Sequence, residues 1–194
     1  PEVVTGTIEP SALNIVSAEP PSWNIEAKWR HANGSDLLTE SQRWSLLEDD
    51  KLLFLDLDWT LQAIPDIDIE QHAYGGLFIR MPFRQSSGGD VINANSLRDE
   101  DTEQQAATWV DLHMPLENSE NGAGITVCDH PKNLDHPVHW RVDDSCGINP
   151  APCIPNPIEL PAGAMLRFRY RLILHNGPLP PEQINKQWAT FARV

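Results

Sequence analysis

The sequence has little positive charge. Its 194 residues include 14 Lys and Arg against 28 Asp and Glu, a formal net charge of −14 with neutral histidines. An acidic surface repels phosphate backbones, so we expect no binding to nucleic acid. It also repels anionic membrane surfaces. We therefore expect neither nucleic acids nor membranes among its partners.

Long apolar runs and paired cysteines are also missing. No stretch approaches the roughly 18–20 apolar residues needed to span a bilayer, and no basic-then-apolar leader is visible. Cys128, Cys146 and Cys153 form an odd set without CxxC spacing, which indicates neither a zinc knuckle nor a disulfide framework. We expect three thiols in a soluble protein of a reducing compartment such as the cytoplasm. A single Cys146–Cys153 bridge is the alternative.

The residues that are present favour strands. With 40% apolar residues and seven tryptophans, the chain has enough material for a core. Leu53–Ala63 and Met165–His175 alternate apolar and polar residues, which is typical of half-buried strands. In the first, Asp56 and Asp58 share the outer face, as a solvated face or a calcium site. In the second, Arg167, Arg169 and Arg171 point outward, and we expect them to pair with acidic neighbours. Shorter strands are predicted at Asn24–Arg30, Gln42–Leu47, Leu77–Phe83, Thr108–Met114, Ile125–Cys128 and Val138–Val142.

Many short strands with few helices predict an all-β fold, an antiparallel β-sandwich. One short C-terminal helix is expected after Pro180-Pro181, with Ile184, Trp188 and Phe191 on one face. Asp99–Ala106 is a weaker helix candidate that suits a loop equally well. The proline-rich stretch 150–161 predicts a stiff loop. No linker divides the chain, so residues 1–194 are predicted to form a single domain.

The segment from Asp129 to Asp143 has the richest chemistry, with three histidines, several carboxylates, an arginine and a tryptophan. Imidazole titrates near neutral pH and can act as a general acid or a general base. The candidate acid–base groups are His130 or His136 with Asp129 or Asp111. Glycoside hydrolysis would instead use two carboxylates, chosen from Asp129, Asp111 and Asp143.

The sequence also offers candidates for substrate binding. Trp140 or Trp109 would stack on a substrate ring, and Arg141 or Arg80 would hold a carboxylate or keto oxygen through paired donors. All of these residues also have structural interpretations, because Trp109 and Trp140 suit a core and Asp129-His130-Pro131 suits a turn. The spacing of His130 and His136 matches no standard zinc motif, so we predict no metal and no cofactor. A 2-His-1-carboxylate iron site stays as an alternative.

Several motifs together resemble a known family. They are Tyr74-Gly75-Gly76-Leu77-Phe78-Ile79-Arg80-Met81-Pro82-Phe83-Arg84, Trp109-Val110-Asp111, the segment Asp129–Asp143, and Arg169-Tyr170-Arg171-Leu172. In this order they resemble the bacterial family labelled "methane oxygenase PmoA-like". That resemblance implies a large two-sheet supersandwich of the galactose-mutarotase type and, since such genes occur among sugar-catabolism genes, carbohydrate chemistry. Members are longer and carry an HPHHRG-type motif in an N-terminal third, so the resemblance covers the C-terminal two-thirds.

Our leading hypothesis is a carbohydrate-active protein that acts on a sugar or glycoside by acid–base chemistry, as a glycoside hydrolase, lyase or sugar isomerase. Its partner would be a small sugar or a glycan. A non-catalytic carbohydrate-binding or structural module, assembled as a homo-oligomer, is the first alternative. A metal-dependent oxygenase, as the family label implies, is the second. Particulate methane oxygenase is a membrane enzyme, and this chain has no spanning segment, so we do not expect that reaction.

Overall fold

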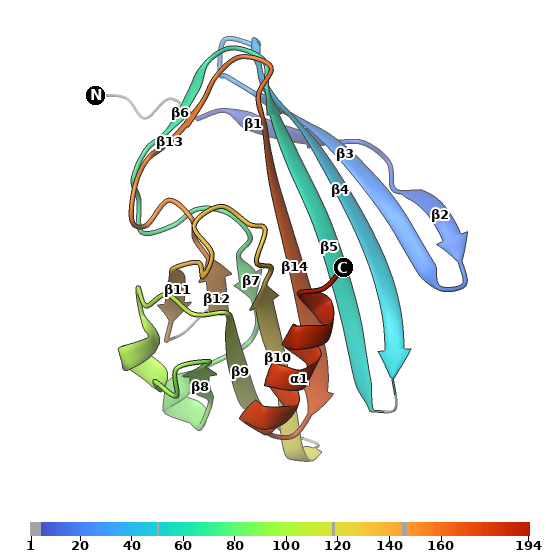
Figure 1. Cartoon of the computed structure of the whole chain (residues 1–194), viewed down its shortest axis with the longest axis vertical. Helices are drawn as coiled ribbons and strands as arrows, with labels where there is room; N and C mark the ends of the chain where they lie inside the picture. The colour runs from blue at the N-terminus through green and yellow to red at the C-terminus, as the bar shows by residue number, and fades with distance from the viewer. Residues whose placement is uncertain (1–4, 50, 118, 145–146) are drawn as a thin grey trace.

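The chain folds into antiparallel β-sheets with one α-helix near its C-terminus (Figure 1). This computed structural model describes residues 5–49, 51–117, 119–144 and 147–194. The predicted antiparallel β-sandwich with one short C-terminal helix is confirmed. The division into domains stays a prediction.

A nine-stranded antiparallel sheet forms the body of the protein. Its order is β1-β3-β4-β5-β14-β10-β9-β8, with β2 paired to β3 outside this path. Its strands are β1 (Thr7–Pro10), β2 (Asn14–Ala18), β3 (Pro21–Arg30), β4 (Asp36–Asp49), β5 (Leu52–Ala63), β8 (Asp90–Asn93), β9 (Trp109–Leu116), β10 (Ser119–Asp129) and β14 (Met165–Asn176). A smaller sheet has the order β11 (Trp140–Asp143), β12 (Gly147–Pro150) and β7 (Ile79–Arg80). A separate ribbon pairs β6 (Ile67–Ile69) with β13 (Ile158–Leu160).

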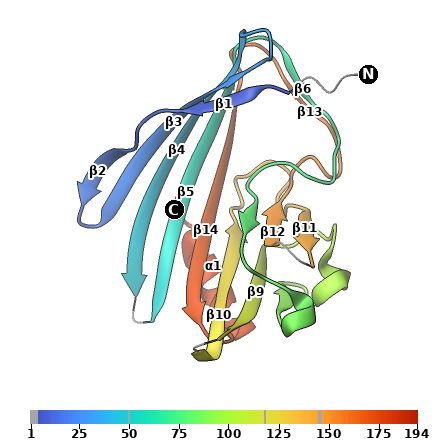
Figure 2. The same ribbon diagram turned by 180° about the vertical axis from the view of Figure 1, so that it is seen from behind.

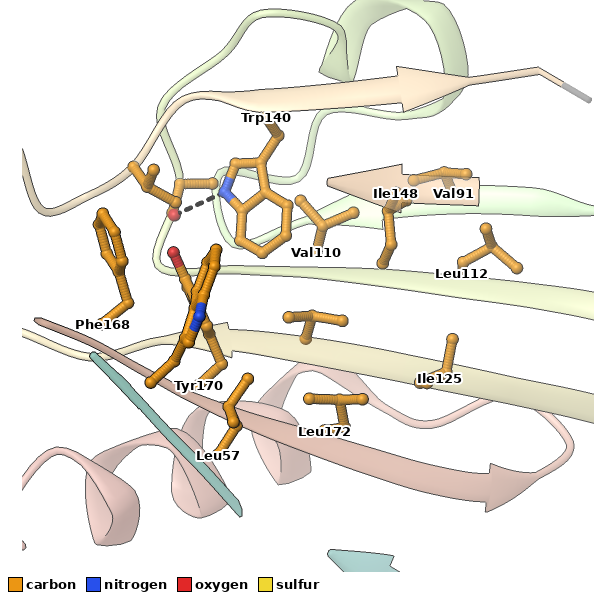
Figure 3. Packing of buried hydrophobic residues seen from close by; sticks show 14 of the residues in the cluster. Leu57, Val91, Val110, Leu112, Ile125, Trp140, Ile148, Phe168, Tyr170 and Leu172 are labelled. Atoms are coloured by element: carbon orange, nitrogen blue, oxygen red, sulfur yellow. Dashed lines mark hydrogen bonds between the residues drawn. The ribbon is translucent and has the colours of Figure 1, made fainter. Parts of the chain in front are cut away.

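The main core lies between the large sheet and the small sheet. Alternation along β5 and β14 places Trp59 opposite Phe168 and Leu57 opposite Tyr170. These side chains form one buried cluster with Trp140 of β11 and Ile148 of β12 (Figure 3). We call this side of the large sheet the inner face and the opposite side the outer face.

Helix α1 (Pro181–Phe191) covers part of the outer face. Its Ile184 and Phe191 are buried with Phe54, Trp109 and Ile173 in a second cluster. Proline near the first turn starts this helix, because its missing N–H has no partner there in any case. The predicted apolar face of the helix is therefore confirmed.

The outer face is less solvated than we expected, because the helix covers some of its charges. Arg171 is 8% exposed, and its Nε and Nη2 donate to the two oxygens of Asp56 at 2.6 and 2.7 Å. Arg167 forms the same fork with Asp58 on the exposed part of the face. The predicted pairing with acidic neighbours is confirmed for Arg167 and Arg171, whereas Arg169 forms no ion pair within the described residues. The two pairs occupy both carboxylates that the sequence left as a solvated or calcium-binding face.

Several local predictions were wrong or incomplete. The strand expected at Leu77–Phe83 is reduced to β7, and the candidate helix at Asp99–Ala106 is a 3₁₀ turn at Asp99–Thr102 followed by a loop. Strands β1, β2, β6, β8, β12 and β13 were not predicted, because they have only three to five residues, and some of them include prolines that weaken strand propensity. Cys128 and Cys153 are free and buried, whereas Cys146 lies outside the described residues. Among the described helices, none is long and apolar enough to cross a membrane.

The small sheet covers only part of the inner face. Seen from behind in Figure 2, β11 and β12 lie beside β9 and β10 and do not reach β3 and β4. Near one end of β3 and β4, Trp29 and Leu38 pack against the β6–β13 ribbon. Trp23, Trp29 and Trp44 on this side are half-buried, so the inner face of these strands is aromatic and only partly covered.

Candidate functional site

The structure distributes the eight predicted site residues over three places. These are the end of β10 with Asp129, His130 and His136; the outer face of β9 with Trp109 and Asp111; and the small sheet with Trp140, Arg141 and Arg80. They do not converge on one pocket. Their assigned roles stay predictions, and each place has its own geometry.

Asp129 and His136 form a close pair. The Asp129 carboxylate is fully buried and accepts hydrogen bonds from His136 Nδ1 at 2.6 Å, Asn133 Nδ2 at 2.7 Å and the backbone N–H of Val138 at 2.9 Å. Burial raises the pKa of Asp129, and these three donors act in the opposite direction. Because a carboxylate only accepts, Nδ1 carries the proton and His136 Nε2 is left as the acceptor. Nε2 has no hydrogen-bond partner among the described residues and is not sealed from solvent.

His136 has limited room around it. Its ring lies parallel to that of Trp188 with centroids 6.1 Å apart, and 16% of its side chain is exposed. Trp188 is held in turn, because its Nε1 donates to the carbonyl of Asp129 at 2.8 Å. His136 lines none of the cavities described below. The pair can exchange a proton with a small molecule at Nε2, but it has no built pocket around it.

His130 is placed unfavourably for acid–base chemistry. It is completely buried, with its ring edge-on to Phe191 at 5.0 Å. Burial lowers the pKa of His130 to about 4, and the nearby positive charge of Arg169 adds to this effect. Its Nδ1 accepts from the backbone N–H of Lys132 at 3.0 Å. A neutral, sealed imidazole at neutral pH cannot reach a substrate in this structure.

Asp111 belongs to a different network, on the outer face. Its Oδ1 accepts from Thr126 Oγ1 at 2.6 Å and from His175 Nε2 at 2.9 Å. His175 Nδ1 donates to the carbonyl of Gly177 at 2.6 Å, so both ring nitrogens face acceptors. Burial opposes charge on His175, but the hydrogen bond and charge of Asp111 outweigh it, and the pKa of His175 is raised. The two side chains are 2% and 5% exposed, which favours a structural ion pair.

His175 was not predicted as a member of this network. The close fit around it involves Gly124, where an added Cβ would lie 2.2 Å from the His175 ring. A glycine directly opposite a histidine in the β10–β14 register is the signal, but it is readable only once the strand pairing is known.

The three predicted carboxylates do not form a hydrolytic pair. Side chains alternate along a strand, so Asp129 follows Ile125 and Val127 on the inner face, whereas Asp111 pairs with His175 on the outer face. Asp143 lies in the small sheet beside Arg141. Both carboxylates of a glycosidase must flank the same bond, within about 5–9.5 Å of each other. Asp129 and Asp111 on opposite faces of one sheet cannot do so.

Both predicted tryptophan platforms are buried. Trp140 is in the inner core, and its Nε1 donates to the carbonyl of Ala107 at 2.8 Å (Figure 3). Trp109 lies under α1, and its Nε1 donates to Asn185 Oδ1 at 2.8 Å. Neither indole offers a face to a ligand in this structure. Their stacking role is untested, and their burial argues against it.

Arg141 is occupied by protein groups. Its Nη1 donates to Glu103 Oε1 at 2.5 Å and its Nη2 to Tyr74 Oη at 3.1 Å, with the guanidinium 4.9 Å from the centre of the Tyr74 ring. The hydrogen bond that Arg141 donates to Glu103 raises the pKa of Arg141 above its usual value. Arg141 therefore positions Tyr74, and its charge is neutralised before any ligand arrives.

Arg80 lies beside a cavity of about 370 Å³, which we call the Arg80 cavity. Its lining residues are Tyr74, Gly75, Gly76, Phe78, Arg80, Asp143 and Asn149. Arg80 is exposed, with its guanidinium 5.5 Å from the centre of the Phe78 ring. Among the described residues it has no acidic partner. The cavity thus combines a guanidinium with two aromatic rings.

The loop at Gly75-Gly76 forms one wall of this cavity and is held in place by Asn149. Asn149 Nδ2 donates to the carbonyls of Gly75 and Leu77, both at 2.9 Å, and its Oδ1 accepts from the N–H of Gly75. Gly76 has φ +87°, and an added Cβ would lie 2.7 Å from the carbonyl oxygen of Pro150. A side chain at this position would displace the loop.

On its other side the same loop borders an apolar groove of about 260 Å³, which we call the indole groove. Both cavities include Gly75 and Gly76. The groove is bordered by Trp29 and Trp59 of the large sheet, by Phe168, and by aliphatic residues of the β6–β13 ribbon. The loop therefore separates an apolar site from a polar one.

A hydrogen-bonded carboxylate holds the indoles of this region. Glu40, only 5% exposed, accepts from Trp29 Nε1 at 2.5 Å, from Trp59 Nε1 at 2.9 Å and from Gln42 Nε2 at 2.5 Å. Gln42 Oε1 in turn accepts from Trp44 Nε1 at 2.8 Å. We call these five residues the indole network. Sequence reasoning missed it, although Glu40, Gln42 and Trp44 alternate along a strand as residues of one face must.

Within the described residues, no group of three or more His, Cys, Asp or Glu side chains comes close enough together to hold a metal ion.

Several solved structures resemble the chain at low similarity. The alpha-galactosidase from Lactobacillus brevis is 12% identical with a TM-score of 0.44, and the alignment covers 96% of this chain and 28% of that one. The GH36 alpha-galactosidase AgaB from Geobacillus stearothermophilus is 10% identical with a TM-score of 0.35, covering 89% and 27%. The galactosidase domain of alpha-galactosidase-sucrose kinase, AgaSK, is 9% identical with a TM-score of 0.36, covering 89% and 27%. This chain spans less than a third of each, and with TM-scores below 0.5 no functional conclusion follows.

Sequence comparison identifies the family. No curated protein matches the chain. The resemblance to the family labelled "methane oxygenase PmoA-like" is wrong, because the family model that matches residues 3–189 is a different one. The motifs behind that resemblance include core positions such as Trp109 and Val110, which reflect packing rather than a reaction. The chain belongs to DUF6807, a family of unknown function.

Proposed function

We propose that this protein binds carbohydrate at the Gly75-Gly76 loop, with a sugar ring against the indole groove and its hydroxyl groups toward the Arg80 cavity. The observation that carries this proposal is the adjacency of the two cavities, which share only this loop. A sugar has apolar C–H faces and a polar rim, and it therefore needs an aromatic wall next to directed hydrogen-bonding groups.

The indole network supports this proposal. Ligand sites gain affinity when their side chains are held in place before binding. Glu40 and Gln42 satisfy the N–H groups of Trp29, Trp44 and Trp59, so the indole planes are oriented without a ligand. Glu40 is in this sense a positioning residue. The half-buried Trp29 is the groove indole that contacts the ligand, and the buried Trp59 supports it from the core.

The test is binding of a panel of monosaccharides and oligosaccharides by calorimetry, with two matched variants. Trp29→Ala removes a groove indole, and Trp44→Ala removes a half-buried indole of the same network that lines neither cavity. We expect Trp29→Ala to lower sugar affinity by about tenfold or more, corresponding to about 1.4 kcal/mol. Trp44→Ala is expected to change affinity less than threefold, by roughly 0.6 kcal/mol. A wild-type protein that binds no sugar, or two variants with equal losses, would contradict the proposal.

Acid–base chemistry on a sugar is a second candidate, favoured by the Asp129–His136 pair. A buried carboxylate fixes the tautomer of His136 and leaves Nε2 as a base, as in catalytic histidines. The measurement is product analysis with glycosides and free sugars for wild type, His136→Asn and the exposed-site control His31→Asn. Turnover that is lost only in His136→Asn, with a pH profile following one titrating group, is expected. Turnover that survives His136→Asn would rule out this role.

A further inference from the structure

We infer that the carbohydrate taken by the Arg80 cavity carries a carboxylate, and that Arg80 is the residue that recognises it. This inference rests on the proposed function and narrows its ligand to sugar acids of the uronate class. Two features of Arg80 support it: this arginine has no carboxylate partner among the described residues, and it lies beside a cavity with aromatic side chains in its wall.

Several guanidinium groups in this acidic protein are held by carboxylates. Arg141 is bound by Glu103, Arg167 by Asp58 and Arg171 by Asp56. Arg43 and Arg169 have no such partner among the described residues, but the cavity that they line also contains Asp56 and Asp58. Arg80 has no such partner among the described residues, although the chain contains twice as many acidic as basic side chains. A cation left unpaired next to a cavity in such a protein is available to a ligand.

The geometry of Arg80 suits a carboxylate. Its guanidinium lies over the ring of Phe78, and a guanidinium that stacks through its face keeps its N–H donors free at the edge. These donors form a planar fork that matches the two oxygens of a carboxylate. The backbone of Arg80 is also fixed, because β7 pairs with β12 and places Arg80 opposite Gly147.

The remaining walls of the cavity favour a sugar acid over a simple anion. Tyr74 offers a ring that is 48% exposed and whose hydroxyl is already oriented by Arg141. Asp143 contributes acceptor oxygens that suit hydroxyl donors, and its charge is offset by Arg141 Nη2 at 3.5 Å. The volume of about 370 Å³ falls in the usual range of about 300–1,000 Å³ for small-ligand sites. A sugar ring with several hydroxyls and one carboxylate can pair with Arg80, stack on Tyr74 and donate hydrogen bonds to Asp143.

The experiment compares matched sugar pairs by calorimetry: methyl galacturonide against methyl galactoside, and methyl glucuronide against methyl glucoside. We expect the wild-type protein to prefer the uronide by about tenfold or more, a difference that shrinks as salt rises. Arg80→Gln is expected to bring the uronide-to-neutral ratio close to one. Arg98→Gln is the matched control, because it makes the same charge change at an exposed arginine that lines neither cavity. It is expected to leave the ratio unchanged.

The outcomes separate the two proposals. Neutral and acidic sugars that bind equally would overturn the role of Arg80 and leave carbohydrate binding intact. If neither sugar type binds, the proposed function itself fails. Acetate or benzoate that binds as tightly as the uronides would show a general anion site and overturn the assignment to sugar acids. Arg80 is exposed, so its variant is expected to fold, and circular dichroism checks this.

Discussion

The two halves of the large sheet differ in how deeply they bury polar side chains. Strands β9, β10 and β14 are covered by the small sheet inside and by α1 outside, and Asp129, His130, Asp111 and His175 are sealed there. The small sheet does not reach β3 and β4 (Figure 2), whose Trp29 and Leu38 pack against the β6–β13 ribbon near one end. There Glu40 accepts from the indoles of Trp29 and Trp59, and Gln42 accepts from that of Trp44. The half with the most conspicuous motifs is therefore mainly core, whereas the less conspicuous half borders the groove.

The largest effect is expected in the covered half, for Asp129→Asn. The amide replaces one of the acceptor oxygens that now receive three hydrogen bonds, and it leaves buried donors facing an NH₂ group. We expect a loss of about 4 kcal/mol in the free energy of unfolding, measured by urea denaturation. Asp135→Asn changes an exposed acid in the same loop and is the control, expected to cost less than about 0.5 kcal/mol. Equal losses of unfolding free energy in the two variants would contradict the structural importance of the buried Asp129 carboxylate.

The second prediction compares a covered and an exposed ion pair on the same strand, β14, through the variants Arg171→Gln and Arg167→Gln. Both arginines form forked pairs with β5 aspartates, but Arg171 is covered by Phe191 of α1 and Arg167 is exposed. A buried pair broken on one side leaves an uncompensated charge, so Arg171→Gln is expected to cost about 3 kcal/mol. Arg167→Gln is expected to cost less than about 1 kcal/mol, because solvent screens its pair. Thermal and urea unfolding measure both, and a larger loss for Arg167→Gln would contradict the role of the helix cover.

Glu40→Gln tests the half of the large sheet that contains β3 and β4. Its new NH₂ group faces indole N–H donors, so we expect a loss of about 2 kcal/mol in unfolding free energy and a shift in tryptophan fluorescence. Glu26→Gln is the matched control, because Glu26 is an exposed acid of neighbouring β3 that accepts only from Ser41 Oγ. Unchanged fluorescence and stability in Glu40→Gln would mean that Glu40 does not orient the indoles.

The smallest effect concerns pH and the two sealed histidines, which respond in opposite directions. His130 has a pKa of about 4 in the folded state, so below about pH 6.5 the unfolded chain binds a proton that the folded chain does not. Acidification from pH 7 to 5.5 should therefore cost about 1 kcal/mol through His130. His175 has a raised pKa, so its contribution is fully present below about pH 6.5 and is lost as the pH rises through the folded pKa.

Unfolding curves from pH 5.5 to 8.5 for wild type, His130→Leu and His175→Asn separate these two contributions. The acid-side loss is expected to be smaller in His130→Leu, and the alkaline-side loss smaller in His175→Asn. An acid-side loss that is the same in His130→Leu as in wild type would contradict the buried, neutral state of His130.

The sequence predicts the secondary structure of this protein better than it predicts which residues meet at a site. Alternation predicted β5 and β14, and the apolar face of α1 followed from Ile184, Trp188 and Phe191, because these periods are local. The outward positions of the β5 aspartates and of the β14 arginines were also predicted, but which carboxylate each arginine meets depends on the β5–β14 register and was not. The sites were not predictable in this way. Asp111 and His175 are 64 residues apart, and they meet only because β14, β10 and β9 are neighbours in the sheet.

What the sequence alone determined is the acidic surface, the period-two strands and the C-terminal helix, since each depends on composition or on residues close in the chain. The tertiary structure decided which polar groups are sealed and which border a cavity. Asp129 and Asp111 lie on opposite faces because of the strand register, and Trp29, Glu40 and Trp59 meet because three strands pair side by side. Sheet order, register and the partial cover by the small sheet are non-local, and burial and access to ligand depend on them.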